Sequence, residues 1–297
     1  MILPDFVLPT RANTQWAYSG IDTQELCLDA EHFRAYPHPI RYTFNSRGFR
    51  DAEWPNTVDE LQSAVWCVGD SFTVGVGCPV EHTWPCMLQQ HTLLRSINVS
   101  MDGASNNWIA RHLARIIAQI QPETVIAQWS YLERREDHSN SMLNRNWQEF
   151  YCQVAAPDWP PVPAIENFAQ LPQHIQLELL TKHDQCWRQG ISDEQLRLGH
   201  VRSTDQEDIQ NTQDLIHWTE SVAQQHGVKL IHSFIPRFAT VSIRNDFFAQ
   251  VTMQHCVGEI PQLDWARDHH HYDSKTAQWI VQQLMQLLQL PSAVPVL

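Results

Sequence analysis

The chain has 297 residues, and its 33 acidic and 20 basic side chains give a formal net charge of −13 when the histidines are neutral. This charge argues against general binding to nucleic acid, because affinity for a phosphate backbone comes from Lys and Arg side chains that displace counterions. No polybasic stretch is present that would hold an anionic membrane. A chain of this length buries a sizeable core without disulfides or metals.

Several features of the sequence predict a cytoplasmic location. The first residues lack the charged start and the apolar stretch of a signal peptide. No uninterrupted apolar run approaches the roughly 18 residues that are needed to span a bilayer. The seven cysteines are widely spaced and include no Cys-x-x-Cys pair, which is typical of free thiols in a reducing compartment.

Residues 1–60 have no strong hydrophobic period, and we interpret them as an N-terminal extension packed on a main domain of residues 61–297. Within the extension, the β-prone residues Tyr42, Thr43 and Phe44 precede a turn-like segment from Asn45 to Gly48. This pattern predicts a short hairpin or an edge strand.

From residue 64 onward, short apolar runs alternate with segments of helical period. Predicted strands cover residues 64–68, 96–101, 124–127 and 228–235, and predicted helices cover residues 84–94, 105–120, 214–225 and 277–288. Ser105 stands at an expected N-terminal cap, and Gly227 at an expected C-terminal cap. The alternation predicts an α/β fold with three layers, α/β/α, in which helices cover both faces of a central parallel sheet.

Residues 131–207 interrupt this alternation after the third predicted strand. They contain a proline-rich run from Ala155 to Pro163 and a stretch of helical period from Ile175 to Trp187. We interpret the segment as an insertion near the carboxyl ends of the strands, which is the edge of a parallel sheet where ligands bind.

The first predicted strand leads into a glycine-containing segment, VWCVGDSFTVGVG, from Val65 to Gly77. This segment lacks the Gly-Lys-Ser/Thr end of a phosphate-binding loop and the third glycine of a dinucleotide fingerprint. Thr73 also stands where the nucleophile elbow of lipases has its second glycine. The three common glycine motifs therefore do not fit.

The segment instead resembles the first sequence block of the SGNH (GDSL-type) hydrolases, in which a strand is followed by Gly-Asp-Ser. A second match lies near the other end of the chain, where Asp268 and His271 form an Asp-x-x-His pair just before the last predicted helix. Two such matches at the expected ends of an α/β chain are more specific than either one alone. The resemblance implies an SGNH-hydrolase domain of flavodoxin-like arrangement.

The resemblance also implies roles for individual residues. Ser71 matches the nucleophile, His271 matches the base, and Asp268 matches the carboxylate that orients the base. These roles have a physical reason. A serine hydroxyl needs an adjacent base to become a nucleophile, and a carboxylate fixes the tautomer of that base. Gly103 matches the glycine whose backbone N–H, with that of Ser71, receives the oxyanion. No cofactor and no metal ion are implied.

One block of this sequence departs from the family. The third predicted strand ends Ala127-Gln128-Trp129-Ser130, without the asparagine whose side chain donates to the oxyanion in the family. Ser130 is the candidate substitute. Loss of one such donor costs about 10²–10³ in rate, so catalysis can persist without it.

Other residues have two interpretations. The run His269 to His271, flanked by Asp264 and Asp273, contains ordinary metal ligands, but adjacent histidines in a loop do not easily face one ion. Arg134 and Arg135 either bind an acidic substrate group or pair with nearby glutamates. The aromatic residues of the insertion either stack on sugar rings or belong to the core: Trp147, Tyr151 and Trp159.

The expected function is therefore that of a serine esterase that forms an acyl-enzyme. Its substrate would be a small-molecule or glycan acyl ester, and a carbohydrate deacetylase is the finer form of this hypothesis. One alternative is an O-acyltransferase that uses the same triad. Another is a non-catalytic binding protein on this fold, which the absent asparagine would explain. The sequence does not indicate an oligomeric state.

Overall fold

The computed structural model describes residues 6–29, 31–132, 134, 205–239 and 241–289. The chain divides into two compact units, Met1–Arg134 with Ile209–Leu297, and Arg135–Asp208. The fold and the site below belong to the first unit. The predicted insertion, residues 131–207, falls almost wholly outside the described residues, as does the helix predicted within it from Ile175 to Trp187.

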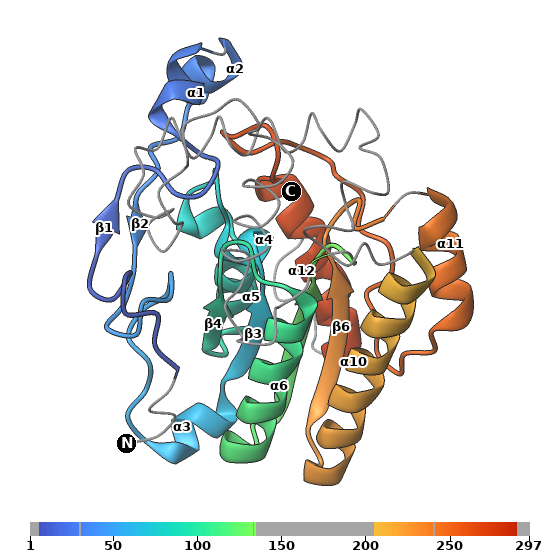
Figure 1. The fold of residues 1–297 in the computed structure, drawn as a ribbon. Helices are drawn as coiled ribbons and strands as arrows, with labels where there is room; N and C mark the ends of the chain where they lie inside the picture. The colour runs from blue at the N-terminus through green and yellow to red at the C-terminus, as the bar shows by residue number, and fades with distance from the viewer. Residues whose placement is uncertain (1–5, 30, 133, 135–204, 240, 290–297) are drawn as a thin grey trace, which may run out of the picture. The chain divides into compact units, whose positions relative to one another are not determined.

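A four-stranded parallel sheet forms the centre of the first unit (Figure 1). Its strands are β3 (Val65–Gly69), β4 (Ser96–Ser100), β5 (Thr124–Trp129) and β6 (Lys229–Phe234), in the order β4-β3-β5-β6. This is the flavodoxin-like order, in which the first strand of the sheet lies inside it. Nearly every strand residue is buried, as a sheet covered on both faces requires.

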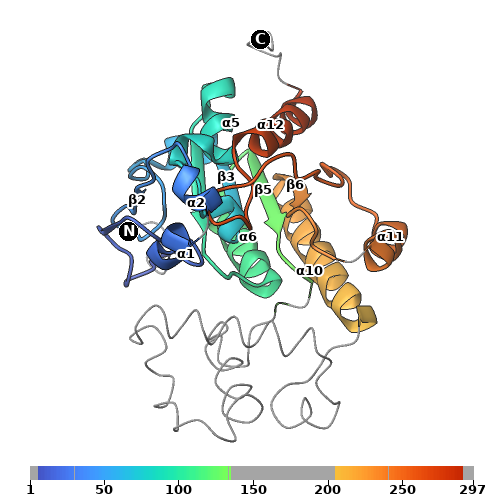
Figure 2. The ribbon, with the colours of Figure 1, turned by 90° about the horizontal axis from the view of Figure 1, so that it is seen from above.

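Helices cover both faces of the sheet, as Figure 2 shows from above. One face carries α5 (Trp84–Thr92) and α12 (Ser274–Leu288), and the other carries α6 (Asn106–Ile120) and α10 (Asp205–His226). The predicted three-layer α/β/α fold is thus confirmed. Ser105 caps α6 as predicted by accepting a hydrogen bond from Trp108 N at 3.2 Å. Helix α10 begins nine positions before its predicted start, because the polar residues 205–213 give little hydrophobic period.

The segment after β6 contains a helix that the sequence did not predict, α11 (Val241–Gln250). Beyond it, the chain returns alongside β6. The N–H of His232 donates to His255 O at 2.7 Å, and Val257 N donates to His232 O at 2.8 Å. These contacts pair part of the outer edge of β6, which would otherwise be exposed to strands of other chains. Among the described residues, no helix is long and apolar enough to cross a bilayer.

The N-terminal residues form two short strands and three short helices. Strand β2 (Tyr42–Thr43) confirms the predicted edge strand, but its antiparallel partner is β1 (Gln15–Trp16) rather than the next segment. The hairpin interpretation was wrong: the turn forms, with Asn45 N donating to Phe49 O at 2.9 Å, but residues 49–57 after it contain no strand. The helices were not predicted: α1 (Gln24–Asp29), α2 (Glu31–Ala35) and α3 (Val58–Ser63).

A buried carboxylate joins the N-terminal residues to the loop before α12. Asp22 accepts hydrogen bonds from Arg267 Nε at 2.8 Å and Arg267 Nη2 at 2.6 Å, and from Tyr42 Oη at 2.7 Å. The Tyr42 oxygen in turn accepts a bond from Gly77 N at 2.8 Å. One charge therefore connects three segments that are far apart in the sequence.

Replacing Asp22 should destabilise the fold. In Asp22→Ala, Arg267 and Tyr42 lose their acceptor, and breaking a buried ion pair from one side costs about 3–5 kcal/mol. We expect the free energy of unfolding, measured by urea denaturation, to fall by about 3 kcal/mol, because Arg267 retains some contact with water. Asp59→Ala, at an exposed position in α3, is the control and should change it little. Equal stability of the two variants would contradict the role given to Asp22.

Candidate active site

Ser71 lies at the carboxyl end of β3, in the first turn of the short helix α4 (Ser71–Val74). Strand β3 ends at Gly69, and Asp70 caps the helix by accepting a hydrogen bond from Phe72 N at 3.0 Å. The serine is buried, with 3% of its surface exposed. A serine at a helix N-terminus after a parallel strand has its hydroxyl at the edge of the sheet where ligands bind.

The loop before α12 brings an imidazole ring to this serine. His271 Nε2 lies 2.8 Å from Ser71 Oγ, although the two residues are 200 positions apart. The other ring nitrogen, Nδ1, makes a short hydrogen bond with Asp268 Oδ2. Since Nδ1 carries the proton that faces the carboxylate, Nε2 has its lone pair toward the serine hydroxyl. The sequence-predicted residues Ser71, His271 and Asp268 thus form one hydrogen-bonded chain.

The charges of the buried pair are mutually dependent. Burial by itself would raise the pKa of Asp268, but the charge of His271 and the hydrogen bonds from that residue and from His270 N hold it below its ordinary value. Burial by itself would lower the pKa of His271, yet the adjoining Asp268 raises it above the ordinary value, with smaller contributions from Asp102 and Asp70. The site therefore favours an ionised carboxylate and stabilises an imidazolium.

A glycine allows the base loop to approach the serine loop. Gly77 has a φ of +80°, and a Cβ atom at this position would lie 2.9 Å from Asp268 Cγ and 2.9 Å from Ala266 Cβ. Its carbonyl oxygen accepts a hydrogen bond from Arg267 N at 2.7 Å. A side chain here would be strained in conformation and would push the carboxylate away from His271.

A buried polar network lies beside the triad. Gln128 Oε1 accepts hydrogen bonds from Thr73 Oγ1 at 2.7 Å and from Trp84 Nε1 at 3.2 Å. The hydroxyl of Tyr272, the residue after the base, lies 3.2 Å from Gln128 Nε2. Thr73, which replaces the second glycine of a lipase elbow, thus has a structural partner on β5. Phe72 packs against the His271 ring, with 4.4 Å between centroids.

Two backbone N–H groups are candidates for receiving an oxyanion. Gly103 follows β4 with a φ of +76°, and Met101 N donates to Gly69 O at 3.2 Å, which ties this turn to the end of β3. In the part of the chain that the structure describes, the N–H groups of Ser71 and Gly103 donate to no protein acceptor. Their role as oxyanion donors stays a prediction.

The hydroxyl of Ser130, the candidate substitute for the oxyanion donor, is hydrogen-bonded to two protein partners. It donates to Asp70 Oδ2 at 2.6 Å and accepts from Arg134 Nη1 at 3.0 Å. Because the single hydroxyl proton is directed at Asp70, we reassign Ser130 to the support of that carboxylate. The backbone N–H of Ser130 donates to Asn106 Oδ1 at 2.8 Å, which holds the chain after β5 against α6.

Arg134 has a partner that neither sequence interpretation named. Its guanidinium group lies 3.1 Å from Asp70 Oδ2 and packs over the ring of Tyr131. Burial raises the pKa of Asp70, and the arginine opposes this change. The pairing places a guanidinium beside the turn that carries Ser71. Arg135, Trp147, Tyr151 and Trp159 lie outside the described residues.

The three adjacent histidines have different neighbours. His271 belongs to the triad, His270 Nε2 lies 3.2 Å from Tyr131 Oη, and the His269 ring is 5.0 Å from that of Trp265. His269 has a φ of +53°, which turns the chain between the carboxylate and the base. Within the described residues, the metal-ligand geometry considered for this run is not present.

Comparisons with known proteins were made at three levels. No family model matches the chain, and no curated protein matches it in sequence. Solved structures do match. TesA is 12% identical over 76% of this chain and 98% of its own, with a TM-score of 0.39. A GDSL-like lipase from Bacteroides thetaiotaomicron is 9% identical over 80% of this chain and 92% of its own, with a TM-score of 0.29.

A third structure is a member of the lipolytic protein G-D-S-L family from Veillonella parvula. It is 12% identical over 76% of this chain and 98% of its own, with a TM-score of 0.28. Several structural matches are thus GDSL-type lipolytic proteins, the family that the motifs resemble. At such identities and TM-scores, assignment of a function depends on the side chains of this chain.

Substitutions at Gly103 and Ser130 should have different effects. Gly103→Val places a β-branched side chain at positive φ beside the candidate oxyanion position, and loss of a donor costs about 10²–10³ in kcat. Ser130→Ala removes one hydrogen bond to a buried carboxylate, which should lower the free energy of unfolding by about 1–3 kcal/mol and kcat by less than about tenfold. Ester turnover and urea denaturation measure the two effects. A loss of about 10²-fold in a stable Ser130→Ala protein would restore the oxyanion role.

Proposed function

We propose that this protein is a serine-dependent hydrolase of carboxylic esters. The observation that carries the proposal is the buried chain of contacts from Ser71 Oγ to His271 Nε2, 2.8 Å, and from His271 Nδ1 to Asp268. A hydroxyl, an imidazole and a carboxylate in this order are the parts of an activated serine nucleophile. The Gly-Asp-Ser and Asp-x-x-His motifs of the SGNH hydrolases contain these same residues.

In the proposed reaction, Ser71 Oγ attacks the ester carbonyl carbon while its proton passes to His271 Nε2. Asp268 stabilises the resulting imidazolium, and the N–H groups of Ser71 and Gly103 stabilise the oxyanion of the tetrahedral intermediate. When the bond to the leaving oxygen breaks, His271 returns the proton to the alcohol. Water then attacks the acyl-enzyme by the same steps and releases the carboxylic acid.

Two alternatives share parts of this site. An O-acyltransferase would use the same acyl-enzyme and would replace water by an acceptor hydroxyl. Analysis of products with a sugar acceptor present separates transfer from hydrolysis. A binding protein without catalysis would not need the hydroxyl, the base and the carboxylate in hydrogen-bond order. We retain a glycan acyl ester as the proposed substrate class and an acetylated carbohydrate as its finer form.

Removing the nucleophile should abolish turnover without loss of the fold. Ser71→Ala deletes a small hydroxyl whose described side-chain contact is His271, so we expect p-nitrophenyl acetate hydrolysis to fall by about 10⁴-fold or more. Circular dichroism and the urea midpoint check the fold. A fluorophosphonate probe should label Ser71 in the wild type, and Ser274→Ala, at the start of α12, is the control. Labelling of a different serine would contradict the proposal.

The pH dependence should follow His271. The base must be neutral to accept the serine proton, so kcat/KM should rise with pH. Because Asp268 raises the pKa of His271, the midpoint should lie above its ordinary value of about 6.5. Asp268→Asn removes that charge and the tautomer control, so the midpoint should fall and kcat should drop by about 10³–10⁴. A profile that is flat from pH 5 to 9 would mean that no histidine acts as the base.

A further inference from the structure

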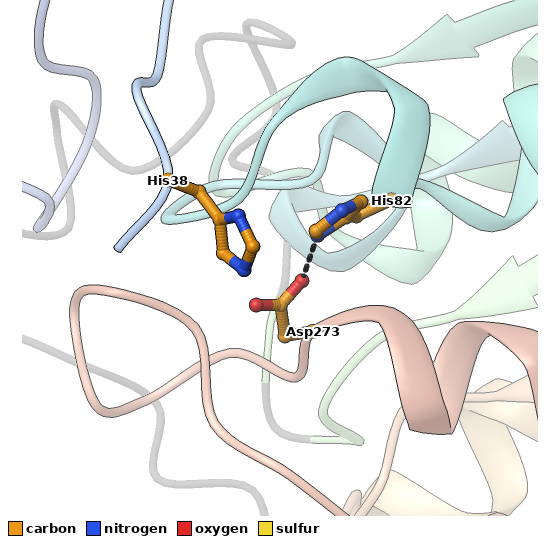
Figure 3. Close-up of side chains that lie close together, drawn as sticks. All are labelled: His38, His82 and Asp273. Atoms are coloured by element: carbon orange, nitrogen blue, oxygen red, sulfur yellow. Dashed lines mark hydrogen bonds and ion pairs between the residues drawn. The ribbon is translucent and has the colours of Figure 1, made fainter. Parts of the chain in front are cut away.

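A second group of chemistry-bearing side chains lies outside the triad. His38 follows α2, His82 ends the short 3₁₀ helix η1 (Val80–His82), and Asp273 caps the N-terminus of α12. Figure 3 shows both imidazole rings beside the Asp273 carboxylate. The three residues come from three separate segments, and the proposed reaction uses none of them; the sequence suggested Asp273 as a metal ligand only beside the run His269 to His271.

The three side chains are close enough to share one ion. Their nearest ligand atoms all lie within 4.8 Å of one another, and the rings of His38 and His82 have centroids 4.8 Å apart. Bonds of 2.0–2.1 Å to a tetrahedral Zn²⁺ place ligand atoms about 3.3 Å apart. The exposed His38 ring would have to move toward the other two ligands, and His82 Nδ1 and Asp273 Oδ1, which are 2.6 Å apart, would have to separate by about 0.7 Å to admit the ion.

The carboxylate of this group is already oriented by neighbours. Asp273 Oδ1 lies 2.6 Å from His82 Nδ1 and accepts a hydrogen bond from Ser274 N at 2.7 Å. Its other oxygen accepts a hydrogen bond from Tyr36 Oη at 2.6 Å. Hydrogen bonds of this kind hold the ligating groups of metal sites in place and typically contribute 10–100-fold to metal affinity.

We propose that His38, His82 and Asp273 form a binding site for one divalent transition-metal ion, with Zn²⁺ as the best match. Two imidazoles and one carboxylate are the donor set of zinc sites that keep a fourth position for water. Ca²⁺ and Mg²⁺ prefer oxygen ligands, and this group offers two nitrogens. On binding, the ion would replace the direct contact between His82 Nδ1 and Asp273 Oδ1, and the neutral imidazole of His82 would carry its one proton on the other ring nitrogen, Nε2.

The ion would act as a structural clip. It would join the segment that carries His38 and the turn that carries His82 to the residue two positions after the base His271. The site does not include Ser71, His271 or Asp268, so ester hydrolysis does not require the ion. The proposed metal site and the proposed ester hydrolysis can therefore be tested independently, and failure of one does not imply failure of the other.

The test is a calorimetric titration of Zn²⁺ into protein freed of metal by dialysis against a chelator. We expect one equivalent to bind to the wild type and to the control His91→Ala, whose histidine lies in the last turn of α5, outside the group. His38→Ala, at an exposed position, should fold normally and bind at least tenfold more weakly. Asp273→Asn keeps a side-chain oxygen to cap α12 and should also lose binding.

Three further tests identify the site. Co²⁺ bound in place of Zn²⁺ should give the intense visible absorption of a four-coordinate ion in the wild type but not in His38→Ala. Tyr36→Phe removes the hydrogen bond to Asp273 and should weaken Zn²⁺ binding by about 10–100-fold. Zn²⁺ should raise the Tm of the wild type and leave that of His38→Ala unchanged. Equal affinity of His38→Ala and the wild type, or absence of binding in both, would overturn the proposal.

Discussion

The buried carboxylate of Asp268 is the constraint on which the site depends. An ionised carboxylate removed from water must be paired and hydrogen-bonded, and Asp268 obtains its partners from its own loop: the N–H groups of His270 and His271 and the ring of His271. Satisfying this one charge folds residues 268–271 into a tight turn. That turn directs the free nitrogen of the imidazole at Ser71.

The remainder of the structure brings this turn to the end of β3. Gly77 leaves room for the carboxylate, and Asp22 holds Arg267, the residue just before it. Asp70 has an analogous position on the other side, where it caps the helix that carries Ser71 and is itself held by Ser130 and Arg134. Three buried acids thus orient the serine loop and the histidine loop: Asp268 has its partners within its own loop, whereas Asp22 and Asp70 have partners from distant parts of the chain.

Much of this arrangement was predictable from local patterns. The four strands and the helices that cover them follow from short apolar runs and helical periods, and the triad follows from two motifs. The contacts by which the N-terminal residues support the site were not predictable. Residues 1–60 have no hydrophobic period, and Asp22 contacts a residue 245 positions away. Ser130 was assigned to the oxyanion because its place after β5 was visible in the sequence, whereas the direction of its hydroxyl depends on the buried Asp70. Buried polar partners of this kind are decided by tertiary packing, which a hydrophobic pattern does not encode.

The separation of 200 positions between Ser71 and His271 has a consequence for protein synthesis. Chains fold progressively from the N-terminus as they leave the ribosome. The elements around the serine can pair early, since β3, β4 and β5 all precede residue 130. His271 is synthesised about 140 residues after β5, just before α12, and closing so long a loop is a late step in forming this site. Under the proposed mechanism, a nascent or C-terminally truncated chain that lacks His271 has no base for Ser71, and ester hydrolysis would require the later part of the chain.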